Sequence, residues 1–291
     1  MKIDITKIIS IIAGSTVLGT GGGGRYDDAI DVVNKLSGVD LISFDELNDE
    51  DIVITAYGVG SLTKTKSTHE AIMNGSQLLQ KQLQKPIAAI VPVEIGPYSV
   101  ASAFEMADML GVPVVDGDLV GYRAVPDIFL ELVTLAKLPR TPLVVGNNEN
   151  DMMILDSLSS SEQLEKIART FADLSKSHTY VLGYPYNKEQ LGKCLAKGSV
   201  SYCLKAENQL ELEFELIGMG VVTADVKRES HGFTEGHLVV SETAIFRIEF
   251  KNEYLVLYKN HELFVTCPEF ICVVDLATGL GLNNGEDNLG K

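Results

Sequence analysis

A run of glycines near the start of the chain limits its fold more than any other feature. Gly19-Thr20-Gly21-Gly22-Gly23-Gly24 has five glycines in six positions, so bare N–H groups can line a concavity and positive φ angles are open at almost every step. Apolar residues at helical spacing precede the run (residues 8–18) and follow it (residues 29–36). The pattern predicts a loop that ends at a helix N-terminus, where backbone donors and the helix dipole favour an anion.

Two interpretations of this loop are open. No strand precedes it, and it lacks both the G-x-G-x-x-G spacing of a dinucleotide site and the Lys-Ser/Thr of a Walker loop. It can be a tight turn between two helices. Alternatively, the amides of Gly21, Gly22, Gly23 and Gly24 bind the oxygen atoms of a substrate or an anion.

The composition excludes several classes of protein. The 291 residues carry a formal net charge of −16, which argues against nucleic acid or an anionic membrane as the main partner. The chain has no apolar run as long as the about 18 residues that indicate a membrane span. The N-terminus turns polar at once and has no signal-peptide pattern, so we expect a cytoplasmic protein with reduced, mostly buried cysteines.

The first two thirds of the chain alternate strand and helix patterns. Because the strands are continuously apolar, we expect an α/β fold with a mostly parallel sheet flanked by helices. The expected strands are residues 41–44, 52–57, 87–93, 113–116, 143–145 and 180–182, and the expected helices are residues 70–83, 101–110, 128–135, 162–177 and 191–196.

From about residue 210 strand patterns dominate, separated by short polar turns. The expected strands are residues 210–217, 220–226, 238–240, 244–250, 254–258, 263–266 and 270–274. This pattern predicts a smaller antiparallel module. We therefore expect an α/β domain with the Gly-rich loop over residues 1–205 and a β-rich domain over residues 206–291. No linker separates them, so they should pack as one body.

Acidic residues follow two neighbouring strands of the expected sheet. Glu94 comes after strand 87–93, and Asp116 and Asp118 come at the end of strand 113–116. The carboxyl ends of parallel strands border the ligand crevice, so we expect these carboxylates and the glycine loop to meet in one cleft. Converging carboxylates hold a divalent ion or divide into an acid and a base. The alternative is that Asp116 and Asp118 form turns and cap helices.

Two further features have two interpretations each. Arg123 either anchors a substrate carboxylate or pairs with Asp118 or Asp127. His231 and His237 either ligate a metal or belong to a surface hairpin loop, and the glycines between them favour the loop.

Several motifs occur in the order of a known family. They are LGTGGGG at residues 18–24, EIG at 94–96, PVVDGD at 113–118, GYRAVPD at 121–127, VTADVKR at 222–228, GFTEG at 232–236, NEYLV at 252–256 and PEFICVVD at 268–275. In this order they resemble the S-methyl-thiohydantoin desulfurase-like family over essentially the whole chain. Tyr122 before Arg123 and Pro97 after Gly96 depart from the family pattern.

The resemblance implies chemistry on a hydantoin, a thiohydantoin or a related cyclic amide. Water would attack the C=O or C=S carbon, with Glu94, Asp116 and Asp118 as catalytic residues. Gly21, Gly22, Gly23, Gly24 and Arg123 would bind the substrate. The cofactor is open, a divalent metal among the options. The alternative is a non-catalytic accessory or small-molecule-binding subunit of a hydantoinase-like enzyme.

The expected partners follow from composition and resemblance together. We expect a small-molecule substrate, no nucleic acid and no membrane. A strand-rich module has edges to cover, so we also expect a homo-oligomer, alongside a hydantoinase-like partner protein.

Overall fold

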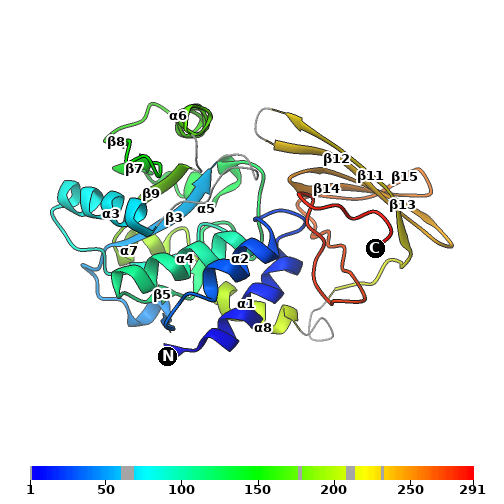
Figure 1. Cartoon of the computed structure of the whole chain (residues 1–291), viewed down its shortest axis with the longest axis horizontal. Helices are drawn as coiled ribbons and strands as arrows, with labels where there is room; N and C mark the ends of the chain where they lie inside the picture. Colours follow the sequence, from blue (N-terminus) through cyan, green and yellow to red (C-terminus); the bar gives the residue numbers. More distant parts are fainter. Residues whose placement is uncertain (1, 60–68, 176–178, 208–213, 231–232) are drawn as a thin grey trace.

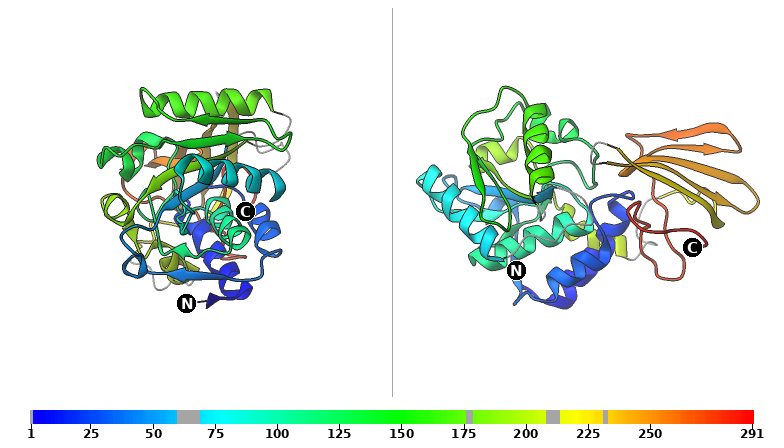
Figure 2. Two further views of the ribbon diagram at one scale, coloured as in Figure 1. Left: turned by 90° about the vertical axis from the view of Figure 1, so that its left-hand side faces the viewer. Right: turned by 45° about the horizontal axis from the view of Figure 1, so that its top comes forward.

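An α/β body lies beside a five-stranded β-sheet in the computed structural model of the chain (Figure 1). The structure describes residues 2–59, 69–175, 179–207, 214–230 and 233–291. Figure 2 shows the sheet to one side of the α/β body in a further view. No helix in these described ranges is long and apolar enough to cross a membrane.

The α/β body is built on an eight-stranded mixed sheet in the order β1-β2-β5-β4-β3-β9-β7-β8. Its strands are β1 (Lys2–Ile3), β2 (Val39–Ile42), β3 (Val53–Val59), β4 (Ala89–Ile90), β5 (Val114–Val115), β7 (Leu143–Gly146), β8 (Met152–Leu155) and β9 (Thr179–Tyr186). Strands β2, β5, β4 and β3 pair in parallel, and β9 pairs antiparallel with both β3 and β7. The expected α/β class, with an antiparallel β-rich part after it, is confirmed.

Helices cover both faces of this sheet because successive strand residues point to opposite sides. Val53 and Val181 belong to one apolar core, whereas the next residues in each strand, Ile54 and Leu182, belong to the other. The helices are α1 (Ile5–Leu18), α2 (Tyr26–Val33), α3 (His69–Leu83), α4 (Pro97–Leu110), α5 (Leu132–Leu135), α6 (Ser161–Leu174), α7 (Lys188–Gly192) and α8 (Ser199–Glu207). Helices α1, α2 and α4 pack on one face, and α6 and α7 pack on the other.

The second sheet is an antiparallel meander in chain order. Its strands are β11 (Val221–Ser230), β12 (Phe233–Ser241), β13 (Ile245–Lys251), β14 (Glu253–Lys259) and β15 (Glu262–Thr266). Buried and exposed residues alternate along β13, so one face of the sheet covers a third apolar core that includes Leu238, Ile248 and Tyr254.

Several elements differ from the sequence-based expectations. Expected strand 87–93 is the two-residue β4, and expected helix 128–135 is a 3₁₀ turn (η2, Ile128–Leu130) followed by α5. Residues 214–217 carry no strand, and the rest of expected strand 210–217 lies outside the described residues. His237 lies in β12, paired with Val226 and Glu249, so the expected hairpin loop does not extend to it, and His231 is not described.

Expected strand 270–274 belongs to none of the described sheets and forms one isolated bridge, between Val274 and Gly281. Its apolar alternation has a different cause. Phe270 and Cys272 pack against the α/β core, while Ile271 and Val273 pack against the core of the second sheet. The segment therefore lies between the two bodies and joins them.

Candidate active site

A cavity of about 600 Å³ lies where the two bodies meet. From the α/β body it is lined by the glycine loop, Tyr57, Glu94, Glu131 and the inner side of α6. The β-rich part contributes Glu229, Thr234, Asn252, Glu253, Asn283 and Asn284. The cavity therefore needs both parts of the chain, as small-molecule sites at domain junctions commonly do.

The glycine loop runs from the end of α1 to the start of α2 through left-handed backbone. The φ angles of Thr20, Gly21, Gly23 and Gly24 are 50°, 90°, 68° and 87°. Close contacts also require glycine here. A Cβ on Gly22 would overlap the Glu253 carboxyl, and one on Gly23 would overlap the backbone of Gly96.

The carbonyl groups of this loop are hydrogen-bonded to the rest of the protein. The Tyr254 N–H donates to Thr20 (2.7 Å), the Asn284 N–H to Gly21 (2.8 Å) and the Tyr98 N–H to Gly23 (2.9 Å). The Gly22 N–H already donates to the Gly19 carbonyl at 2.9 Å, and the Gly23 N–H donates to the Glu253 carboxyl, which lowers the pKa of Glu253. The N–H groups of Gly21 and Gly24 therefore remain the candidate donors to a ligand. The loop is braced by the rest of the protein, and its role in ligand binding stays a prediction.

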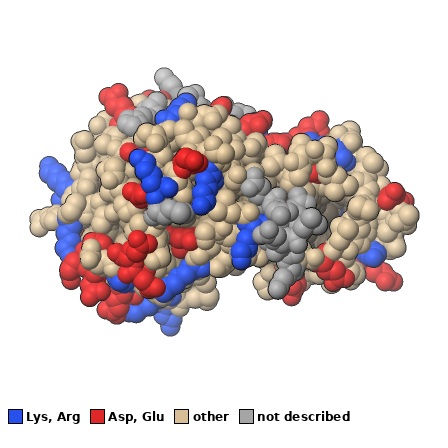
Figure 3. Space-filling model, turned by 90° about the horizontal axis from the view of Figure 1, so that it is seen from below, with Lys and Arg blue, Asp and Glu red and all other residues tan. Residues whose placement is uncertain are grey.

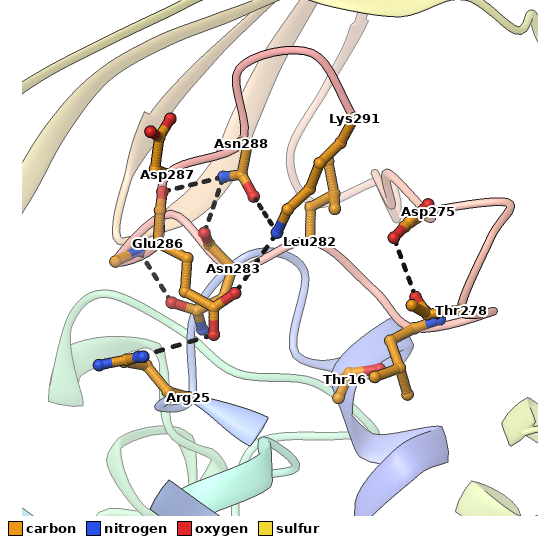
Figure 4. A network of polar contacts seen from close by, with 12 residues as sticks. Thr16, Arg25, Asp275, Thr278, Leu282, Asn283, Glu286, Asp287, Asn288 and Lys291 are labelled. Carbon is orange, nitrogen blue, oxygen red and sulfur yellow. Dashed lines mark hydrogen bonds and ion pairs between the residues drawn. The ribbon is translucent and has the colours of Figure 1, made fainter. Parts of the chain in front are cut away.

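The C-terminal segment holds the loop from the other side (Figure 4). The Asn283 amide donates to the Gly24 carbonyl at 2.8 Å. Glu286 forms ion pairs with Arg25, just after the loop, at 3.6 Å and with Lys291 at 3.5 Å. Asn288 donates to the Asn283 carbonyl at 2.9 Å and so joins Asn283 to the end of the chain.

Glu94 follows β4 and precedes α4, and its carboxyl has two fixed donors. The Ser99 hydroxyl donates to one oxygen (2.9 Å) and the Val125 N–H to the other (3.1 Å). Burial raises the pKa of Glu94 to about 7, while the hydrogen bonds from Val125 and Ser99 lower it and the charge of Asp118 raises it. Glu94 is half-buried, so a ligand in the cavity can reach it.

Glu253 is the functional candidate that the sequence did not single out. It begins β14 directly after Asn252, whose φ of 57° makes the tight turn from β13. Its side chain is 2% exposed and lies against Gly22. Burial and then the charge of Glu94 raise the pKa of Glu253 well above its usual value. The signal in the sequence was the acid within the NEYLV motif, at a strand start.

Asp116 and Asp118 do not line the cavity. Of the three acids expected to meet the glycine loop in one cleft, only Glu94 does so. Asp118 accepts N–H hydrogen bonds from Val120 and Gly121 at 2.6 Å and from Tyr122 at 2.9 Å. Asp116 accepts from the Ser201 N–H at 2.9 Å, at the start of α8. These are turn-forming and helix-capping contacts, and a catalytic role for either residue stays a prediction.

Arg123 is also outside the cavity lining. Its guanidinium donates to the Pro268 carbonyl at 3.0 Å and lies 5.3 Å from the centre of the Phe270 ring. None of the ion pairs between described residues joins it to Asp118 or Asp127. Arg123 thus links the two bodies, while its charge lowers the pKa of Glu253, and its role in substrate binding stays a prediction.

A second polar group forms another part of the cavity wall. Glu131 lines the cavity and forms a buried ion pair with Arg140 at 2.6 Å, and it accepts from the Tyr184 hydroxyl at 3.2 Å. Burial raises the pKa of Glu131 to about 7 although Arg140 lowers it. Arg140 also donates to Ser161 and Thr134. These hydrogen bonds fix the Glu131 and Arg140 side chains in the cavity wall.

Among the described residues, no three His, Cys, Asp or Glu side chains are grouped so that they could hold a metal ion. The described residues around the cavity therefore do not fit a three-ligand metal site.

Two family models together match nearly the whole chain. One, described as "S-Me-THD-like, N-terminal domain", matches residues 6–157, and the other, described as "S-Me-THD-like, C-terminal domain", matches residues 159–291. The chain belongs to the S-Me-THD-like family. The S-Me-THD-like models divide it at residues 157–159, inside the α/β body, and the division at residues 205/206 stays a prediction.

The fold of this chain is also similar to that in a crystal structure of a protein from Chromobacterium violaceum. The TM-score is 0.83 at 19% sequence identity, covering 98% of this chain and 85% of that chain. At this identity the likeness concerns the fold alone. A search of curated proteins finds no match.

Proposed function

We propose that the protein is an enzyme that hydrolyses a hydantoin, a thiohydantoin or a related cyclic amide. One observation carries the proposal: the half-buried Glu94 carboxyl, whose pKa burial raises to about 7, lines the same cavity as the braced glycine loop. A general base is most effective when its pKa lies near the working pH, because a large fraction is then ionised without losing basicity.

The proposed reaction begins with water bound beside Glu94. The carboxylate takes a proton from the water as its oxygen attacks the C=O or C=S carbon of the ring. Negative charge then develops on the exocyclic oxygen or sulfur, and the N–H groups of Gly21 and Gly24 stabilise it. A cavity of about 600 Å³ also fits a five-membered ring with a substituent.

A turnover assay with two small probes tests this proposal. The purified protein is incubated with 2-thiohydantoin or hydantoin, and loss of the ultraviolet absorbance of the thiohydantoin ring is followed. We expect turnover, and we expect Glu94→Gln to reduce the rate about 10²- to 10⁴-fold, the usual contribution of a general base. Glu50→Gln, which removes an exposed carboxylate paired with Lys85, should leave the rate unchanged.

Two outcomes would contradict it. An undiminished rate in folded Glu94→Gln would remove Glu94 as the base. Calorimetric binding of hydantoin without any turnover would favour the accessory, small-molecule-binding role instead.

A further inference from the structure

We propose that Glu253 is a second catalytic carboxyl, the proton donor that works opposite Glu94, so that the β-rich part of the chain supplies half of the chemistry. This inference rests on the proposed hydrolytic function.

The two carboxyls lie near neighbouring residues of the glycine loop. Glu253 packs against Gly22, and the next residue, Gly23, packs against Gly96, two positions after Glu94. Both residues line the same cavity. The fold therefore brings together two acids that are 159 positions apart in the chain.

One oxygen of Glu253 has no hydrogen-bond partner among the described residues although the side chain is 2% exposed. Buried polar atoms in proteins almost always have a partner. An unpartnered carboxyl oxygen beside a cavity is suited to carry a proton. Asn284, which lines the same cavity, also has a buried oxygen without a partner.

The surroundings of the two carboxyls give them different roles. Glu94 accepts hydrogen bonds from Ser99 and Val125, which favour its ionised form. Glu253 is more deeply buried and faces the charge of Glu94, and both raise its pKa, although its own N–H, Arg123 and the Gly23 N–H lower it. Asp118, the charged group beside Glu94, raises the pKa of Glu94. In the proposed pair, Glu94 with its two hydrogen-bond donors is the base, and Glu253 with its unpartnered oxygen keeps its proton and is the acid.

The protons balance over one turnover. The Glu94 carboxylate accepts a proton from water as the C–O bond forms at the ring carbonyl carbon. Glu253 donates its proton to the ring nitrogen as the C–N bond breaks, which releases that nitrogen as an N–H group and leaves a carboxylic acid. Glu94 is then protonated and Glu253 ionised, and transfer of one proton from Glu94 to Glu253 restores the pair.

The first test needs no turnover. Glutamate is labelled with ¹³C at its carboxyl carbon, and the signals of Glu94 and Glu253 are assigned from Glu94→Gln and Glu253→Gln and titrated by NMR. We expect Glu253 to remain protonated through neutral pH in the parent protein and to ionise at lower pH in Glu94→Gln, because the neighbouring charge is gone. An identical titration of Glu253 in both proteins would overturn the pairing.

The second test measures rates with the same two probes. Glu253→Gln should lose about 10²- to 10⁴-fold in kcat/KM and should also lose the alkaline limb of the pH–rate profile, where the acid must be protonated. Glu262→Gln, on the exposed edge strand of the same sheet, is the control. Full activity in folded Glu253→Gln would overturn the assignment. If the parent turns over neither probe, the proposed function fails, and the NMR linkage still decides whether the two carboxyls form a pair.

Discussion

At the scale of single residues, the site is built from carboxyls that are more stable protonated in the folded protein than in water. Glu94 and Glu131 both have a pKa raised to about 7 by burial, although each accepts hydrogen bonds that oppose the shift. A protein that keeps such groups gives up stability at neutral pH, which is common where chemistry needs a proton near pH 7.

The raised pKa of Glu94 makes the free energy of unfolding depend on pH. Between about pH 4.5 and pH 7 the folded state holds the Glu94 proton that the unfolded state has released, so the free energy of unfolding falls as pH rises and levels off above 7. Because glutamine stays neutral, the Glu94→Gln variant should lack this fall in the free energy of unfolding. At pH 8 it should be more stable than the parent by on the order of 2 kcal/mol. Urea unfolding at pH 5 and pH 8 measures it.

The control for this prediction is again Glu50→Gln. Lys85 lowers the pKa of Glu50, so that variant should show no gain at pH 8. If Glu94→Gln and the parent lose equal stability between pH 5 and pH 8, Glu94 does not titrate in that range.

At the scale of elements, the turn after β6 (Gly117–Asp118) shows how a carboxylate can organise structure instead of chemistry. Asp118 accepts three backbone N–H hydrogen bonds with both of its oxygens, whereas Asp116 accepts one from Ser201. Asp118→Asn must place an NH₂ group against a donor and should lower the free energy of unfolding by about 1–3 kcal/mol. Asp116→Asn keeps one acceptor oxygen and should cost within about 1 kcal/mol.

The same pair of variants separates the structural role from the catalytic one. Denaturant unfolding and the thiohydantoin assay are run on both. A folded Asp116→Asn protein with normal turnover would support helix capping, and a stable protein without turnover would restore Asp116 as a catalytic residue.

Most elements could be predicted because apolar periodicity is a local property of the sequence. The glycine loop between two helices and Glu94 beside it followed from such patterns. Strand β9 was foreseen, but its antiparallel direction was not, because pairing with β3 and β7 depends on chain reversals that periodicity does not record. Residues 270–274 alternate like a strand, yet they alternate between two cores. Glu253 was missed because only tertiary packing sets it against Gly22.

At the scale of the whole molecule, acidic and basic side chains are interspersed on the face seen in Figure 3. This distribution suits solubility more than capture of a polyanion, in keeping with the formal net charge of −16. The proposed catalytic residues come from both bodies, so contacts between the bodies also fix the geometry of the site. The segment around Phe270, packed into both cores, and the Arg123–Pro268 hydrogen bond serve that purpose.

Self-association is the prediction that belongs to this scale. The two end strands of the second sheet differ: the C-terminal residues cover β11 through hydrogen bonds between Val222 and both Gly290 and Lys291, whereas β15 is the opposite edge. On β15, Leu263 is 62% exposed and Phe264 is 46% exposed. An apolar edge strand is favourable for pairing with a second copy. We therefore expect a homo-oligomer by light scattering at micromolar concentration.

A single substitution tests whether this edge is responsible. Phe264→Lys places a charge on the exposed edge, as natural edge strands do to block pairing, and should shift the protein toward the monomer without changing its unfolding midpoint. Lys259→Arg, on neighbouring β14, keeps its charge and serves as the control. If the parent is a monomer of 31.6 kDa, the expectation of self-association is wrong. If it is an oligomer that Phe264→Lys leaves intact, the contact lies elsewhere. Because the cavity lies between the two bodies of one chain, we expect the monomeric variant to keep its turnover.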